Sequence, residues 1–180
     1  AMHTHEHVGF NASAQRYGHD VETLDHYTDQ VIQTTRKVMA KLLKPVGISQ
    51  EMVDLTATTA LEHFTATIAT QLLSNAHIQE LMTDETMKNM WMWHAIEENE
   101  HKAVAYDVFE AVFGNGLKAY ALRTSSLVIS MATLAVVQSY FLARLLKQDN
   151  QLNLESLKSI YTYAYSPSKG VITGMGREML

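Results

Sequence analysis

The sequence predicts an all-α fold, a helical bundle, and three observations support this prediction. Only two Pro and eight Gly interrupt the 180 residues, so long helices can form without breaks. No run alternates apolar and polar β-branched residues between turn signals, as a strand would. Apolar residues instead recur every three to four positions, and hydrophobic residues make up 47% of the chain, enough for a core. Without a linker, repeat or low-complexity segment, residues 1–180 are expected to form a single domain.

Capping residues and helix breakers mark about five to six helices. Asp20 and Ser49 are favourable N-caps, as is Thr83 or Asp84 for a later helix that ends before Gly114. The expected helices cover residues 1–17, 20–44, 49–74, 84–113, a segment after 116, and 153–165, with a helical turn inside 75–83 and a loop over 170–180.

The composition excludes several kinds of protein. The chain has no Cys, which excludes disulfides, thiolate zinc sites and iron–sulfur clusters. Any metal must therefore be held by His and carboxylate side chains. A net charge of -5 without a basic block argues against a nucleic-acid partner. The polar, His-rich start shows no secretory signal, so we expect a cytoplasmic protein.

Residues 124–143 contain no charged side chain. Twenty residues is the length of a bilayer span. Hydroxyl and amide side chains dilute this segment, however, whereas a single span is usually a more continuous block of Leu, Ile, Val and Phe. A buried bundle helix or an oligomer contact, such as a homodimer interface, is therefore favoured over a span, while contact with a membrane surface stays open.

The candidate site centres on residues 87–112. Wound as an α-helix, this segment places six apolar side chains on one face: Met87, Met90, Trp91, Ala105, Val108 and Val112. Four polar side chains interrupt the middle of that face: His94, Glu97, Glu98 and His101. Burying a lone carboxylate is expensive, so such a group is normally paired, protonated or bound to a metal. Glu98-x-x-His101 also has the spacing with which one helix gives two ligands to one ion.

Two other segments offer metal-binding side chains. Glu62 lies on an apolar face rich in small Ala and Thr residues, where a carboxylate needs a partner and another helix can approach closely. The neighbouring His63 lies further round the helix, and we expect it to be packed or exposed rather than a ligand. Near the start of the chain, His3 and His7 share a face with Phe10 and are candidate ligands, although side chains near a chain end are often frayed.

These residues allow two interpretations, a metal site or a buried Glu–His hydrogen-bond network. Helical bundles bind two metals with a Glu from each of two helices and a Glu-x-x-His motif from each of two others. The chain supplies one complete motif and Glu62, while His3 is the His of a second motif whose Glu would precede Ala1. The donor types suit iron, manganese or zinc.

Three segments resemble a bacterial family of predicted metal-dependent hydrolases. They are WHAIEENEHKAVAYDVFE, the LEHFTA segment around Glu62, and His3-x-x-x-His7-x-x-x-Asn11. The resemblance covers most of residues 3–125 and implies a ferritin-like bundle. Its implied metal ligands are Glu62, Glu98, His101 and His3, with His7 and His94 near the site. Family members extend further at both ends, so the resemblance also implies an N-terminally truncated chain that binds two metals, one or none, or completes its site across a dimer.

The resemblance implies a metal-dependent hydrolase acting on a small molecule that the sequence does not identify. In that reaction a metal-activated water attacks, and Glu97 is a candidate general base. Two alternatives stay open. One is a di-iron oxidase or oxygenase, and the other is a non-catalytic helical protein with a degenerate site that oligomerises or associates with membranes.

Overall fold

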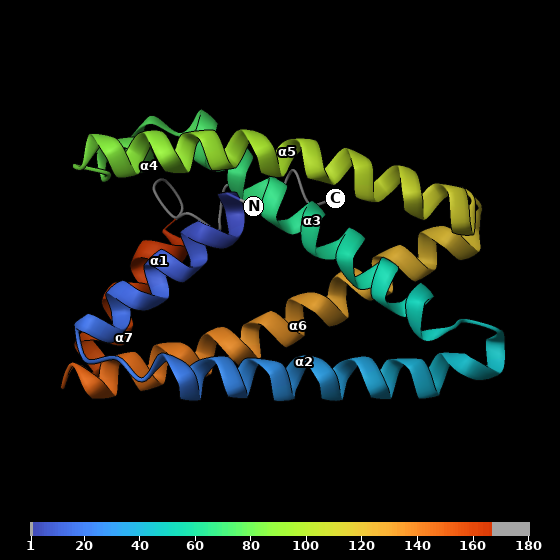
Figure 1. The fold of residues 1–180 in the computed structure, drawn as a ribbon, viewed down its shortest axis with the longest axis horizontal. Coiled ribbons are helices and arrows are strands. Elements are labelled where there is room, and N and C mark those ends of the chain that lie inside the picture. The colour runs from blue at the N-terminus through green and yellow to red at the C-terminus, as the bar shows by residue number, and fades with distance from the viewer. Residues whose placement is uncertain (1, 167–180) are drawn as a thin grey trace.

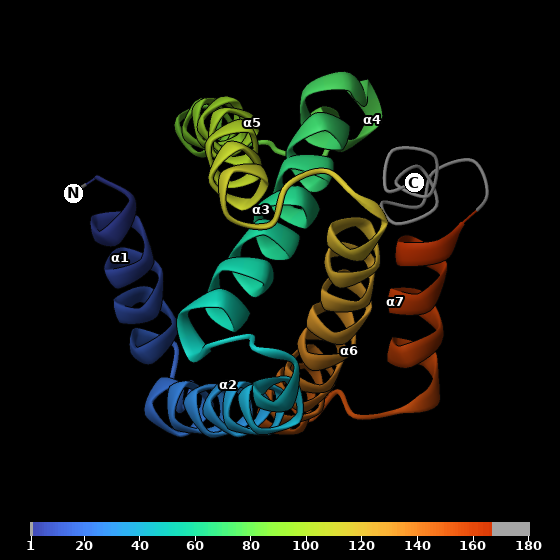
Figure 2. The ribbon, with the colours of Figure 1, turned by 90° about the vertical axis from the view of Figure 1, so that its right-hand side faces the viewer.

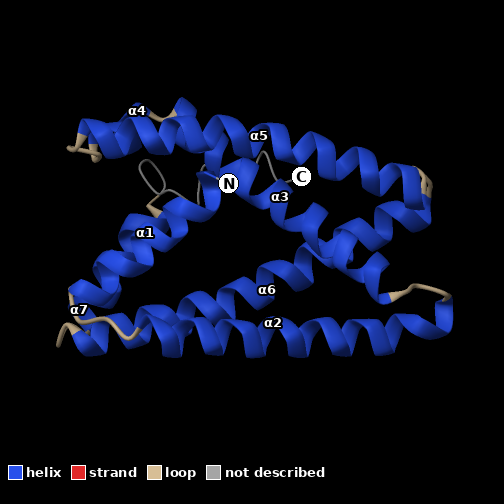
Figure 3. Ribbon diagram, in the orientation of Figure 1, coloured by secondary structure: helices blue, strands red, loops and turns tan. Residues whose placement is uncertain are grey.

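The computed structural model describes the backbone of residues 2–166 and the side chains of residues 8–9 and 11–166. Within this range the chain forms six helices of 12 or more residues, one five-residue helix and one 3-10 turn, which confirms the predicted all-helical bundle (Figure 3). The elements are α1 (Met2–Arg16), α2 (Val21–Leu43), η1 (Lys44–Val46), α3 (Gln50–Ser74), α4 (Ala76–Glu80), α5 (Glu85–Phe113), α6 (Leu117–Gln148) and α7 (Leu154–Tyr165). The loop predicted at 170–180 lies outside the described residues.

The predicted helix boundaries are confirmed by their caps. The side chains of Asp20, Ser49 and Asp84 each accept a hydrogen bond from the backbone N–H three residues further on, at 3.1, 3.3 and 2.9 Å. Asp84 rather than Thr83 therefore caps α5. Gly18 follows α1 with a φ of +85°, in the left-handed region that favours glycine.

The central helix of the bundle is α3, which packs against α2, α5 and α6. In Figure 1, α5 lies across the top and α2 across the bottom, while α3 and α6 run obliquely between them. Figure 2 shows α1 and α7 on opposite sides of the molecule, with α1 rising from α2 toward the level of α5. Because α3 contacts all three of these helices, its side chains determine how closely each of them approaches it.

Small side chains let α3 and α5 approach closely, as the sequence predicted. Ala66 and Ala69 of α3 are 1% and 4% exposed, and they lie four and seven positions after Glu62, so the face that carries Glu62 is a buried surface of short side chains. At this distance the Thr59 hydroxyl reaches across the interface and donates to the backbone carbonyl of Ala105 at 3.3 Å. We call this contact between the two helices the α3–α5 interface.

The apolar face predicted for α5 is buried less than expected, and that prediction was wrong for most of its residues. Four of them remain 36–47% exposed: Met87, Trp91, Val108 and Val112, here called the exposed α5 stripe. The buried residues of α5 are Ala95, Glu98 and Phe109. Among the described elements, α3 alone covers α5 extensively, so it buries a narrow strip beside the predicted face.

Of the described helices, α6 is long and apolar enough to cross a bilayer. The core helix of a soluble protein passes the same test of length and composition. Only 17% of its most apolar window is buried inside the chain. The helix contacts α2 and α3 along one side, so it does not form the fully buried bundle helix that the sequence favoured. The oligomer contact that was the other favoured reading stays a prediction.

An ion pair joins α2 to α3 at one end of the bundle. Arg36 donates through Nε to Oδ1 of Asp54 at 2.7 Å and through Nη2 to Oδ2, and the amide of Gln50 donates to Oδ1 at 3.0 Å. The hydrogen bonds from Arg36 hold the pKa of Asp54 below its usual value, although partial burial opposes them and the bond from Gln50 assists.

We expect Asp54→Asn to lower the free energy of unfolding at pH 7 by about 0.5–1 kcal/mol, because the pair is two-pronged but partly exposed. A carboxyl group whose pKa is lower in the folded than in the unfolded protein contributes its full stabilisation at pH values above its unfolded pKa, which is about 4. That contribution is lost as the pH falls through the folded pKa, so the wild type and the variant should converge in acid. Denaturant unfolding between pH 7 and pH 2 measures both effects.

Asp29→Asn is the matched control, since Asp29 is exposed on α2 and forms no ion pair with any residue that the structure describes. It should change stability little across the same pH range. Equal losses in the two variants would mean that net charge, and not the contact with Arg36, causes the effect.

Candidate metal centre

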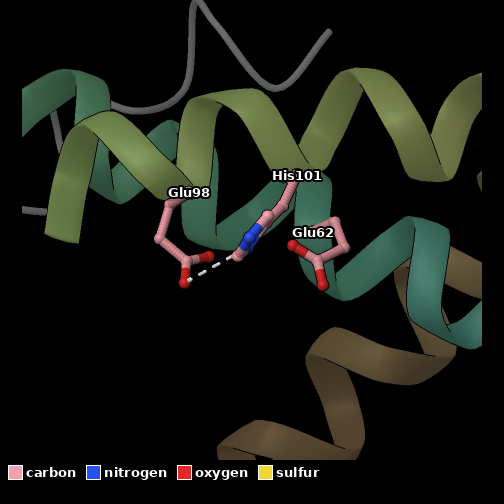
Figure 4. A group of neighbouring side chains, drawn as sticks. All are labelled: Glu62, Glu98 and His101. Atoms are coloured by element: carbon pink, nitrogen blue, oxygen red, sulfur yellow. Dashed lines mark ion pairs between the residues drawn. The ribbon is translucent and has the colours of Figure 1, made fainter. Parts of the chain in front are cut away.

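Three potential metal ligands meet at one edge of the α3–α5 interface. Glu98 and His101 project from α5, and Glu62 projects toward them from α3 (Figure 4). One ligand atom of each lies within 4.8 Å of those of the other two. The structure therefore brings together the Glu-x-x-His motif and the lone Glu that the sequence indicated on two separate helices.

The group spans the boundary between the core and the surface. Glu98 is buried and Glu62 half-buried, whereas the side chain of His101 is 50% exposed. A small molecule can therefore reach the imidazole from solvent, while the carboxylate of Glu98 is held inside the fold. This change from buried Glu98 to exposed His101 suits a site with protein ligands on one side and room for water or substrate on the other.

His94 contacts the group through Glu98. Its Nε2 lies 3.5 Å from Oε1 of Glu98, the same oxygen that lies 4.0 Å from Nδ1 of His101. The edge of the Trp91 ring packs against the imidazole of His94, with ring centroids 5.6 Å apart. His94 is thus placed to orient the carboxylate of Glu98, as residues just outside a metal's ligand shell commonly do.

The donor set fits a divalent cation. Glu62 and Glu98 bring two carboxylates into a partly buried volume, where their negative charges repel unless a cation or proton intervenes. Two carboxylate oxygens and one imidazole nitrogen suit manganese, iron or zinc and not a soft ion such as Cu(I). The side chains present therefore fit a divalent metal, and its identity as iron, manganese or zinc stays a prediction.

Three other predicted site residues lie outside this group or outside the described side chains. Glu97 is half-buried on α5 and is not one of the three clustered residues, so its role as a base stays a prediction. His3 and His7 belong to α1, whose backbone is described, but their side chains are not among those described. Their role as ligands therefore stays a prediction as well.

Sequence reasoning missed Asn99, which fixes α5 against α3 next to Glu98. Its Oδ1 accepts a hydrogen bond from the Thr70 hydroxyl at 3.1 Å, and its Nδ2 donates to the carbonyl of Ala95 at 2.8 Å. The only signal in the sequence is its position beside a predicted ligand, because the partner Thr70 belongs to another helix.

Comparison with known families agrees with this geometry. A family model described as "Predicted metal-dependent hydrolase" matches residues 1–180. Comparisons with curated proteins and with solved structures found no match. The family match covers the segments around Glu62 and Glu98 that carry the clustered ligands. The chain belongs to the family of predicted metal-dependent hydrolases.

Proposed function

We propose that this protein is a metal-dependent hydrolase that acts on a small molecule, with Glu62, Glu98 and His101 as ligands of a divalent iron, manganese or zinc ion. The observation that carries the proposal is the convergence of the three ligand atoms within 4.8 Å, in a chain that belongs to this family. The absence of Cys from the chain adds support, because it limits the ligands to carboxylates and imidazoles.

A divalent ion at this site would supply Lewis-acid activation of water at neutral pH. The protein's own residues do the remaining work. Glu62 and Glu98 balance the charge of the ion, and His94 keeps the carboxylate of Glu98 in one orientation. Glu97, on the same helix, takes the proton of the attacking water as general base. The exposed side of His101 faces the solvent from which the substrate enters.

We further propose that the site is part of a ferritin-like arrangement to which α1 contributes. Glu62 and Glu98-x-x-His101 correspond to half of the donor set of two-metal helical bundles. In support, α1 rises toward the level of α5 in Figure 2. On this proposal His3 and His7 add ligands. The measured number of bound ions then distinguishes a one-metal site from a two-metal site.

Two other functions use the same fold. The carboxylate-rich donor set also suits iron in an oxidase or oxygenase, and iron that consumes oxygen without ester hydrolysis would favour that reading. A non-catalytic protein would keep the cluster as a hydrogen-bond network and use α6 for oligomerisation or membrane contact. The family description favours hydrolysis.

Metal binding should depend on all three clustered residues. We expect tag-free wild-type protein to retain stoichiometric metal after dialysis, whereas Glu62→Gln, Glu98→Gln and His101→Ala weaken affinity at least about tenfold. Mass spectrometry of the elements in the dialysed protein gives the identity and number of the ions.

Glu100→Gln is the matched control, because it removes one exposed carboxylate from the same helix. Metal at about 100 times its Kd should also raise the Tm by about 5–10 °C in the wild type and this control. At the same metal concentration Glu98→Gln should show at most about half of this rise, because the metal is then at no more than about 10 times its weaker Kd. Stoichiometric metal in all three ligand variants would refute the proposed site.

Glu97 should affect the reaction without affecting the metal. We expect Glu97→Gln to retain metal but to lower kcat about 100-fold or more against p-nitrophenyl acetate or bis(p-nitrophenyl) phosphate, because a general base contributes roughly that much. Loss of metal from this variant would instead make Glu97 a ligand, and unchanged kcat would remove it from the mechanism.

We also propose that a second copy of the chain covers the exposed α5 stripe. Its four apolar side chains flank the Glu62, Glu98 and His101 group, and the described part of the chain leaves them 36–47% exposed. A dimer built through this stripe would also shield the open side of the metal centre.

Light scattering should therefore give twice the chain mass of 20.2 kDa. Val108→Glu should shift the protein to monomer, because it places a charge within the apolar contact. Ile96→Glu, on the same helix and 53% exposed outside the stripe, should leave the dimer intact. A monomeric wild type at micromolar concentration would contradict this prediction.

A further inference from the structure

A cavity lies between α3, α5 and the first three turns of α6, apart from the candidate metal centre. Its volume is 610 Å³, within the range of small-molecule sites. None of Glu62, Glu98 and His101 lines it. The cavity therefore needs an explanation of its own.

Arg123 is the distinctive residue of this cavity. Its Cζ lies 5.1 Å from the ring centroid of Tyr106 and 5.7 Å from that of Tyr120, so two aromatic rings hold the guanidinium in place. Arg123 is half-buried and makes no hydrogen bond or ion pair with any residue that the structure describes. Stacking occupies the faces of a guanidinium and leaves its N–H groups available to an acceptor.

The other lining residues favour an organic anion. Lys102 of α5 adds a second cation, and Asp107 is the only carboxylate that lines the cavity among the described residues. With His63 neutral, the formal charge of the lining is positive. Leu127 and Val128 supply apolar wall, so a purely inorganic ion would leave most of the space unfilled.

We propose that this cavity binds an organic anion, a carboxylate or phosphate that carries an apolar group. Arg123 and Lys102 bind the anionic end through charge-assisted hydrogen bonds. Tyr106 and Tyr120 keep the guanidinium oriented, and the apolar wall contacts the rest of the ligand. None of the three clustered metal-binding residues lines the cavity, so the two sites share no residue.

Calorimetric titration of the full chain with phenyl phosphate and with phenylacetate tests this inference, using protein freed of metal by a chelator. We expect at least one of these anions to bind, and benzyl alcohol and inorganic phosphate to bind at least tenfold more weakly than it does. Because metal is absent, the result stands or falls separately from the proposed hydrolase activity. The tighter of the two anions shows which anionic group the cavity prefers.

Arg123→Gln should weaken binding of that anion about 10- to 100-fold, because it removes the charged donor. Arg123→Lys should recover only part of the loss, since Lys keeps the charge but lacks the planar fork. Lys147→Gln is the control, an exposed cation further along α6 that does not line the cavity. No binding of either anion at millimolar concentration, or equal binding by wild type and a folded Arg123→Gln variant, would overturn the proposal.

Discussion

The close approach of α3 and α5 is the constraint on which the candidate site depends. Ala66 and Ala69 present short side chains on the α3 face that carries Glu62, and the Thr59 hydroxyl donates a hydrogen bond to the backbone of α5. A large side chain at such a buried position would separate the helices, because cores tolerate little added volume. Since the ligands come from both helices, any such separation would move Glu62 away from Glu98 and His101.

The same approach places two carboxylates close together at the boundary between the core and the surface. Glu98 is buried beside Glu62, and the imidazoles of His94 and His101 lie 3.5 and 4.0 Å from its carboxylate, longer than ordinary hydrogen bonds. Burying such groups opposes folding unless a proton or cation compensates. An ordered group of carboxylates and imidazoles that is partly withdrawn from water is typical of a functional site.

The bundle is open around this site. This openness underlies the proposed dimer through the exposed α5 stripe and the proposed binding of an organic anion. Because α3 alone covers α5 extensively among the described elements, the apolar stripe beside the ligands stays accessible. On the other side of the interface, α6 leaves a cavity in which Tyr106 and Tyr120 hold Arg123. The two faces of one helix pair thus present different chemistry, carboxylate and imidazole on one face and guanidinium and ammonium on the other.

The sequence by itself determined the helices and the chemistry of the ligands. Local capping defines where α2, α3 and α5 begin, and the spacing of Glu98 and His101 fixes their shared face, because both depend on residues a few positions apart. The tertiary structure decided which faces are covered: Val108 and Val112 remain exposed, and Asn99 bonds to a helix remote in the sequence. Burial depends on which helix lies opposite, and local periodicity carries no information about that neighbour.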